Sequence, residues 1–261
     1  MGTLQLNTAY LARQLEKNFE NSATDILCLG DSVTEFGNYP LWIEKTTGKR
    51  AYNCGFGGTR YAVHGNVNYD KFSFYQLANA IDSGNWSAQD EANTALISAG
   101  DDNTNQLNRL KAIDFNKIGI ITLFYGTNDW SGNNPIGTIS NTNFDTTTVV
   151  GAINHGIKKI IQKYPHIRIL VITPTHRFVA SDLLESSDDV ANGISLKIES
   201  YVNAIEETAN KFNHLPVKNL FKDGNFNRYN HSQYFVDGVH PNSKGYEVLG
   251  ILIGKEISQK F

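Results

Sequence analysis

The feature of this sequence that most constrains its fold is a series of short, almost continuous apolar runs separated by segments with helical spacing. These runs predict strands at residues 26–29, 50–53, 118–124, 167–172 and 215–217. Apolar periodicity between them predicts helices at 4–19, 71–82, 91–111 (interrupted around Gly100), 149–164, 194–212 and 243–257, with Ser243 capping the last helix. Apolar strands that alternate with helices are typical of a parallel sheet covered on both faces. We therefore predict an α/β fold of three layers, α/β/α, with a flavodoxin-like parallel sheet of about five strands.

The length and composition favour one folded domain with a substantial core. Of the 261 residues, 40% are hydrophobic and 19% are charged, which excludes a mainly disordered chain. Because no repeat or low-complexity linker divides the sequence, we expect a single domain over 1–261, with 1–22 as an N-terminal helix that packs on it or leads into it. The 23 Lys and Arg residues nearly balance the 26 Asp and Glu residues. Such a balance argues against nucleic acid or an anionic membrane surface as a partner.

The two cysteines and the N-terminal segment say little about the compartment. Cys28 and Cys54 are too few for a disulfide framework and lack the spacing of a metal motif, so we interpret them as buried free thiols. The sequence shows no signal peptide and no stretch of the ~20 apolar residues that a membrane-spanning helix needs, so we expect no membrane insertion. Three origins stay open: a cytosolic protein, a mature secreted protein, and a domain from a longer surface or phage-tail polypeptide. The sequence does not indicate the oligomeric state.

Polar, glycine-containing loops follow three of the predicted strands, at the edge of a parallel sheet where ligands commonly bind. The first loop is Gly30-Asp31-Ser32-Val33-Thr34. A serine on a tight turn between a strand and a helix can present its Oγ to a substrate, as in nucleophile elbows. Asp31 and Ser32 also suit a helix N-cap, so the segment taken alone has a purely structural interpretation as well.

The loops after the second strand and after the strand at 118–124 offer hydrogen-bond donors. The segment 53–60 is rich in glycine, which lets backbone N–H groups approach a ligand closely. The segment 125–129 contains Asn128, whose side-chain amide is a donor. Each segment taken alone is equally compatible with an ordinary polar turn.

A fourth segment, Asp237-Gly238-Val239-His240, precedes the predicted C-terminal helix. An Asp and a His three positions apart on a tight turn can pair, so that the carboxylate orients one ring nitrogen and leaves the other free as a base. A structural or solvated pair is the alternative. Together the four segments supply a serine, a base with its orienting carboxylate and several donors, which is the set that acyl transfer requires.

In this order, the four segments resemble the sequence blocks of the SGNH hydrolases, also called GDSL hydrolases. The resemblance extends from Gly30 to His240 and so covers most of the chain. It implies a serine esterase in which Ser32 Oγ attacks an ester carbonyl, His240 takes the proton and Asp237 stabilises the imidazolium. Water then hydrolyses the acyl-enzyme. The resemblance implies no metal or organic cofactor.

The same resemblance implies three donors for the oxyanion: the N–H of Ser32, the N–H of Gly58 and the amide of Asn128. Gly57 or Gly55 takes the role of Gly58 if the register of the second segment differs. Thr59-Arg60 stands where many members of the family have Asp-Thr. We therefore expect any departure from the family pattern in the packing around Gly58.

The sequence says less about the substrate. Members of the resembled family act as lipases, thioesterases, lysophospholipases and deacetylases of acylated carbohydrates. The predicted loops near the site are polar and aromatic, which suits a sugar better than a long alkyl chain. We therefore expect the substrate to carry a short acyl group, most simply acetyl, on a carbohydrate. The residues expected to contact this substrate are Asp31, Tyr39, Trp130, His176 and Arg177. A lysophospholipase or thioesterase, and a carbohydrate-binding module without activity, stay open as alternatives.

Overall fold

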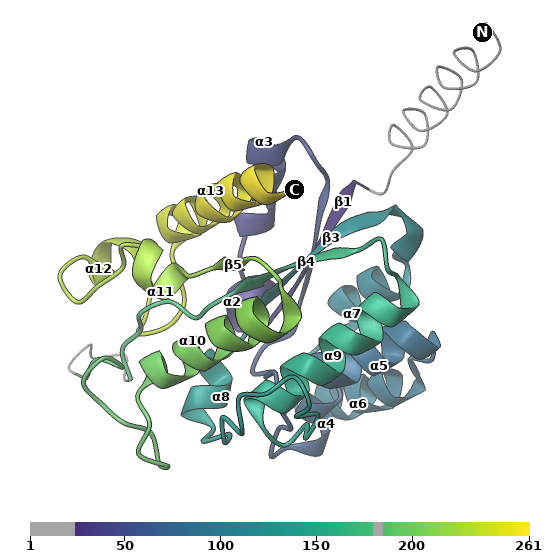
Figure 1. Cartoon of the computed structure of the whole chain (residues 1–261), viewed down its shortest axis with the longest axis horizontal. Helices are drawn as coiled ribbons and strands as arrows, with labels where there is room; N and C mark the ends of the chain where they lie inside the picture. The colour runs from purple at the N-terminus through teal and green to yellow at the C-terminus, as the bar shows by residue number, and fades with distance from the viewer. Residues whose placement is uncertain (1–23, 180–184) are drawn as a thin grey trace, which may run out of the picture.

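A single parallel sheet forms the centre of the computed structural model, which describes residues 24–179 and 185–261 (Figure 1). The strand order is β2-β1-β3-β4-β5, and every pair of neighbours is parallel. The strands are β1 (Asp25–Gly30), β2 (Ala51–Gly55), β3 (Ile118–Phe124), β4 (Arg168–Ile172) and β5 (Val217–Lys218). The predicted α/β fold with a parallel sheet of about five strands is confirmed. The helix predicted at 4–19, and with it the segment 1–22, lies outside the described residues.

Helices cover both faces of the sheet, and alternation along the strands explains why (Figure 1). In β1, Ile26 and Cys28 belong to one buried cluster, whereas Leu27 and Leu29 belong to the other. Successive strand side chains point to opposite faces, so a strand that is apolar at every position requires a helical layer on each side. On one face these layers are α3 (Tyr39–Thr47) and α13 (Ser243–Lys260), and on the other α5 (Phe74–Ser83), α9 (Val149–Lys163) and α10 (Ile198–Glu207).

The remaining elements connect these layers. They are α2 (Ser32–Glu35), α4 (Val67–Asp70), α6 (Ser87–Ser98), α7 (Thr104–Lys111), α8 (Thr127–Ser131), α11 (Leu220–Asp223), α12 (His231–Tyr234), a 3₁₀ turn at Phe115–Lys117 and a π-helical turn at Thr208–Phe212. The helical region predicted at 91–111 is two helices, α6 and α7, with Gly100 between them at a positive φ of 92°. Glycine adopts this conformation without the steric cost that other residues incur.

Several predicted boundaries shift by a few residues, and two of these differences have a clear local cause. The region 194–212 becomes helical only at Ile198, because Ser195 has a positive φ of 62°, which interrupts a right-handed helix. Asn242, rather than Ser243, caps α13, since the Asn242 side chain accepts hydrogen bonds from the N–H groups of Lys244 and Gly245. Asn is as good an N-cap as Ser, so the sequence alone does not separate the two neighbours.

Cys28 and Cys54 are free and buried, as predicted. Burial raises the pKa of each thiol to about 12, so both stay protonated and unreactive near neutral pH. Over the described ranges, no helix combines the length and the apolar character needed to span a bilayer.

The carboxyl ends of the three strands β2, β1 and β3 lie side by side. Gly30, the last residue of β1, pairs with Gly55 of β2 and with Phe124 of β3. The loops that follow these strands therefore start next to one another, which brings together segments that are far apart in the sequence.

Candidate active site

Ser32 is the first residue of α2, which begins almost directly after β1. The turn between them is very close-packed at Gly30, where a Cβ atom would lie 1.9 Å from Thr34 Oγ1 and 2.8 Å from the carbonyl oxygen of Phe124. Only a residue without a side chain fits at this distance. The glycine thus allows the chain to turn sharply and present Ser32 at the end of the sheet.

His240 and Asp237 face Ser32 from the loop that precedes α13. His240 Nε2 lies 2.8 Å from Ser32 Oγ, and His240 Nδ1 lies 2.8 Å from Asp237 Oδ2. The other carboxylate oxygen, Asp237 Oδ1, accepts the backbone N–H groups of Val239 and His240 at 2.6 Å each. Partial burial of Asp237 opposes its ionisation, but these hydrogen bonds outweigh it and lower its pKa below the ordinary value. The structure therefore brings Ser32, His240 and Asp237 into one hydrogen-bonded chain.

Backbone contacts hold this loop in place. The N–H of Val236 donates to the carbonyl of His240 at 2.9 Å, which closes the loop on itself. The N–H of Phe178 donates to the carbonyl of Gly238 at 2.7 Å and ties the loop to the segment that follows β4. The ring of Phe36 meets the ring of His240 edge-on, with 5.7 Å between the centroids. The imidazole is thus oriented by its carboxylate on one side and by an aromatic contact on another.

The glycine-rich loop after β2 lies beside Ser32. Gly58 has a positive φ of 72°. The N–H of Gly55 donates to Asn53 Oδ1, and the N–H of Gly57 donates to the carboxylate of Glu35. Within the described part of the chain, the N–H of Gly58 has no such partner. Of the three glycines considered for an oxyanion donor, Gly58 is therefore the one whose N–H is free.

Asn128 lies in the first turn of α8 and contacts the same loop. Its Nδ2 donates to the carbonyl of Thr59 at 3.0 Å, which occupies one of the two amide hydrogens and leaves the other available. The next residue, Asp129, accepts the N–H groups of Tyr61 and Ala62 at 2.9 and 3.0 Å. Burial raises the pKa of Asp129 to about 6, although these two hydrogen bonds act in the opposite direction. Asp129 thus fixes the Gly58 loop against the helix that carries Asn128.

Asn53 and Asp129 are positioning residues that the sequence patterns did not single out. Asn53 Nδ2 donates to the carbonyls of Thr34 and Gly37 at 2.7 and 2.9 Å. One side chain of β2 therefore holds the chain segment that follows Ser32. The sequence hints at these two residues only because each lies in a segment that we singled out for a different residue, Gly58 or Asn128.

Arg60 belongs to the dipeptide where the family pattern differs, and it bonds to the loop that follows α8. Its Nη1 donates to Asn134 Oδ1 at 2.8 Å. Thr59 is fully buried and its Oγ1 donates to the carbonyl of Phe56 at 2.7 Å. Both side chains therefore contribute to the packing of the loop around Gly58. This is the region in which we expected the chain to differ from the family pattern.

A pocket of about 440 Å³ opens at Ser32. Its described lining includes Ser32, His240, Glu35 and Asp101, together with Gly57, Gly58, Phe36, His64 and Tyr69. Burial raises the pKa of Glu35 above its ordinary value, and the nearby Asp101 carboxylate acts in the same direction. No group of three or more His, Cys, Asp or Glu side chains in the described ranges is arranged to hold a metal ion.

Residues 28–248 match the sequence profile of the GDSL-like lipase/acylhydrolase family. The chain belongs to this family. Membership supports an ester-hydrolysing function, and it suggests small-molecule esters as substrates.

Solved structures agree on the fold of this GDSL-like acylhydrolase. One crystal structure with 22% identity gives a TM-score of 0.68 and covers 91% of this chain and 97% of the other. A protein from Lactobacillus plantarum gives 19% identity, coverage of 92% and 99%, and a TM-score of 0.66. A protein from Chitinophaga pinensis described as "a possible lipase" gives 20% identity, coverage of 90% and 98%, and a TM-score of 0.61. At these identities the likeness shows the fold alone. No match was found among curated protein sequences.

The five residues predicted to contact substrate all have buried side chains in this GDSL-like acylhydrolase. None of the five is more than 9% exposed, and none belongs to the described lining of the pocket at Ser32. They are Asp31, Tyr39, Trp130, His176 and Arg177. Each has a partner inside the protein: Thr34 Oγ1 for the Tyr39 hydroxyl, the Leu196 carbonyl for Trp130 Nε1, Asp188 for His176, Thr127 Oγ1 for Arg177 and the Val33 N–H for Asp31. A direct substrate contact stays a prediction for them, and the geometry favours a supporting role.

Asp31 is a buried carboxylate next to Ser32. It is 2% exposed, and its Oδ1 accepts the N–H of Val33 at 3.0 Å, which caps α2. Burial raises the pKa of Asp31 from 3.8 to about 7; the Asp129 carboxylate acts in the same direction, whereas the Arg177 guanidinium opposes it. Between these two values the folded protein holds a proton on Asp31 that the unfolded chain has lost.

We expect this proton to make the folded state less stable as the pH rises. Because unfolding releases it, the free energy of unfolding should fall between pH 3.8 and about 7, with a contribution from Asp31 of up to about 1.4 kcal/mol per pH unit. Asp31→Asn keeps the acceptor that caps α2 but does not titrate, so its slope should be flatter. Urea unfolding at several pH values measures both slopes. Asp114→Asn, at an exposed N-cap aspartate, is the matched control. Equal slopes in the wild type and Asp31→Asn would contradict this interpretation.

Proposed function

We propose that this chain is a serine esterase in which Ser32 is the nucleophile, His240 the general base and Asp237 the orienting carboxylate. The observation that carries the proposal is the continuous hydrogen-bonded chain from Ser32 Oγ through both ring nitrogens of His240 to Asp237 Oδ2, with 2.8 Å at each contact. This arrangement matches the roles of a serine hydrolase triad.

In this mechanism Ser32 Oγ attacks the ester carbonyl carbon as its proton moves to His240 Nε2. Asp237 accepts the hydrogen bond from Nδ1 and stabilises the positive charge on the ring. The tetrahedral intermediate collapses, the alcohol leaves with the proton from Nε2, and the acyl group stays on Ser32. A water molecule then gives its proton to His240 and attacks the acyl-enzyme, which releases the acid and restores the serine.

We further propose that the oxyanion is bound by the N–H groups of Ser32 and Gly58 and by the side-chain amide of Asn128. Support comes from the two backbone groups, which have no acceptor among the described residues, and from the second amide hydrogen of Asn128. Donors that are fixed before the reaction stabilise the developing negative charge without reorganising, which is a major part of the rate enhancement in acyl transfer.

The proposed substrate is a short acyl ester, represented by acetyl, on a carbohydrate. Two carboxylates, Glu35 and Asp101, line the pocket beside Ser32. A long alkyl chain in this pocket would take these two carboxylates further out of water, which is costly for a charged group. The hydroxyls of a sugar, in contrast, can donate to the carboxylates, and the C–H face of its ring can stack against the neighbouring Tyr69 ring.

The p-nitrophenyl esters of acetate, butyrate and octanoate test this proposal. We expect kcat/KM to fall by about tenfold or more from acetate to octanoate. Ser32→Ala gives the background rate for every ester. A preference for octanoate would support a lysophospholipase or thioesterase instead, and no Ser32-dependent hydrolysis of any ester would support a module without catalytic activity.

A further inference from the structure

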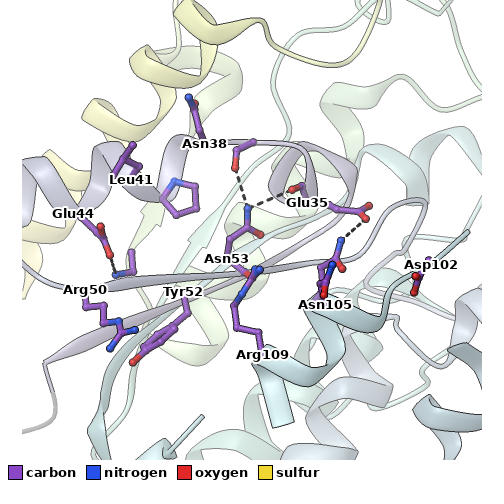
Figure 2. A pocket seen from close by; sticks show the side chains of 14 residues that line it. Glu35, Asn38, Leu41, Glu44, Arg50, Tyr52, Asn53, Asp102, Asn105 and Arg109 are labelled. Atoms are coloured by element: carbon purple, nitrogen blue, oxygen red, sulfur yellow. Dashed lines mark hydrogen bonds between the residues drawn. The ribbon is translucent and has the colours of Figure 1, made fainter. Parts of the chain in front are cut away.

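A second, larger depression lies along β2, the edge strand of the sheet. Figure 2 shows that side chains from α3 flank one side of β2 and side chains from α7 flank the other. We call this depression the β2 groove; its volume is about 720 Å³. Its lining is polar, with three carboxylates, two guanidinium groups and four amides among the described residues. The opposite charges nearly cancel, so the groove suits a neutral polar ligand better than an ion.

The β2 groove adjoins the pocket at Ser32, because Glu35 lines both. A Cβ atom built on Gly57 would lie 2.6 Å from Glu35 Oε2 and 3.8 Å from Ser32 Cβ, so Glu35 and Ser32 flank the same glycine. Gln106 of α7 donates to Glu35 Oε1 at 2.7 Å and holds the carboxylate at this junction (Figure 2). A chain bound at Ser32 can therefore extend past Glu35 into the β2 groove.

An added β-strand is a poor occupant for this groove. An edge strand recruits another strand through its free backbone groups. In β2, however, the N–H of Ala51 already donates to Glu44 Oε1 at 2.8 Å, and the carbonyl of Asn53 accepts a hydrogen bond from Arg109 (Figure 2). The protein's own side chains therefore cover the edge where a partner strand would pair.

Several side chains in the groove are free to bind a ligand. Asn38 and Asn105 are exposed, and neither side-chain amide has a hydrogen-bond partner in the described part of the chain. Leu41 is 48% exposed, and the Arg50 guanidinium lies over one face of the Tyr52 ring, 4.7 Å from the centroid. Amides that can donate and accept, next to flat apolar surfaces, match the alternating hydroxyls and C–H faces of a sugar chain.

We propose that the β2 groove binds the glycan chain that carries the ester, as a neutral oligosaccharide extending from the acylated sugar at Ser32. The inference rests on the proposed esterase function and names its substrate class more closely. It assigns Asn38 and Asn105 as residues that determine the preference for long over short carbohydrate esters.

Acetylated cello-oligosaccharides, from the monosaccharide to the hexasaccharide, test the groove. We expect kcat/KM to rise with chain length in the wild type, and the ratio between hexasaccharide and monosaccharide to fall about tenfold in Asn38→Ala/Asn105→Ala. Hydrolysis of p-nitrophenyl acetate should stay within about twofold, since this small ester does not reach the groove. Asn108→Ala is the matched control, because Asn108 is equally exposed on α7 but does not belong to the described lining. The same length dependence in all three proteins would overturn the proposal.

Binding without catalysis separates a failure of the groove from a failure of the esterase. Ser32→Ala protein is titrated by calorimetry with unacylated cellohexaose, xylohexaose and chitohexaose. Binding that Asn105→Ala weakens and Asn108→Ala does not would support the groove even if no ester is hydrolysed. Binding of none of the three sugars, together with no length dependence, would overturn it. A concentration-dependent dimer that Asn105→Arg disrupts would also overturn it, because the groove would then be an interface between copies.

Discussion

Ser32→Ala and His240→Ala are each expected to lower kcat for p-nitrophenyl acetate by about 10⁴- to 10⁶-fold, and the double variant should be no slower than the slower single variant. The reason is that the two side chains act in one proton transfer: without the base the serine stays a weak nucleophile, and without the serine the base has no proton to take. The 2.8 Å contact between Ser32 Oγ and His240 Nε2 is what couples them. Single-turnover and steady-state rates of the four proteins form the cycle that measures this coupling.

The same cycle distinguishes catalysis from folding. Ser98→Ala, at an exposed serine of α6, controls for the loss of a hydroxyl, and its rate should equal that of the wild type. Asp237→Asn should lose about 10⁴-fold, because an amide no longer selects the ring tautomer that leaves Nε2 free to accept a proton. Losses that multiply in the double variant would show that Ser32 and His240 act independently and would contradict the triad.

The sheet and the order of its elements could be predicted from the sequence, because a continuous apolar run is itself typical of a buried parallel strand. A strand such as β3 is buried at every position, and only a sheet covered on both faces removes all of its side chains from water. Short elements are different. Helix α3 buries only Tyr39, Pro40 and Ile43, a pattern too sparse for periodicity to reveal, and its place is decided by packing against α13.

The segments that meet at the active site could also be predicted, since strand ends of a parallel sheet share one edge. The direction in which each side chain of such a segment points could not be predicted from the sequence. Trp130 and Arg177 follow strands as expected, yet both turn inward, where Trp130 Nε1 finds the carbonyl of Leu196 and Arg177 finds Thr127. The β2 groove could not be predicted from the sequence either. It depends on β2 being the edge strand, and on α7, about fifty residues later in the chain, packing beside it.

Asn128→Ala is expected to lower kcat for p-nitrophenyl acetate by about 10²- to 10³-fold with little change in KM. A donor that binds the oxyanion more tightly than the ground-state carbonyl contributes mainly in the transition state, so its loss appears in kcat. The variant also loses the hydrogen bond from Nδ2 to the Thr59 carbonyl, which should lower the free energy of unfolding by about 1 kcal/mol.

Two further variants separate these effects. Asn128→Asp cannot donate and places a negative charge near the developing oxyanion, so its kcat should be lower than that of Asn128→Ala. Asn116→Ala removes an exposed amide that bonds to Asp114 and to no other residue in the described ranges, and its turnover should match the wild type. If Asn128 only supports the loop, KM and stability will change in Asn128→Ala while kcat stays near the wild-type value. A selective loss of kcat, deepened by the charge in Asn128→Asp, is the pattern that an oxyanion donor alone produces.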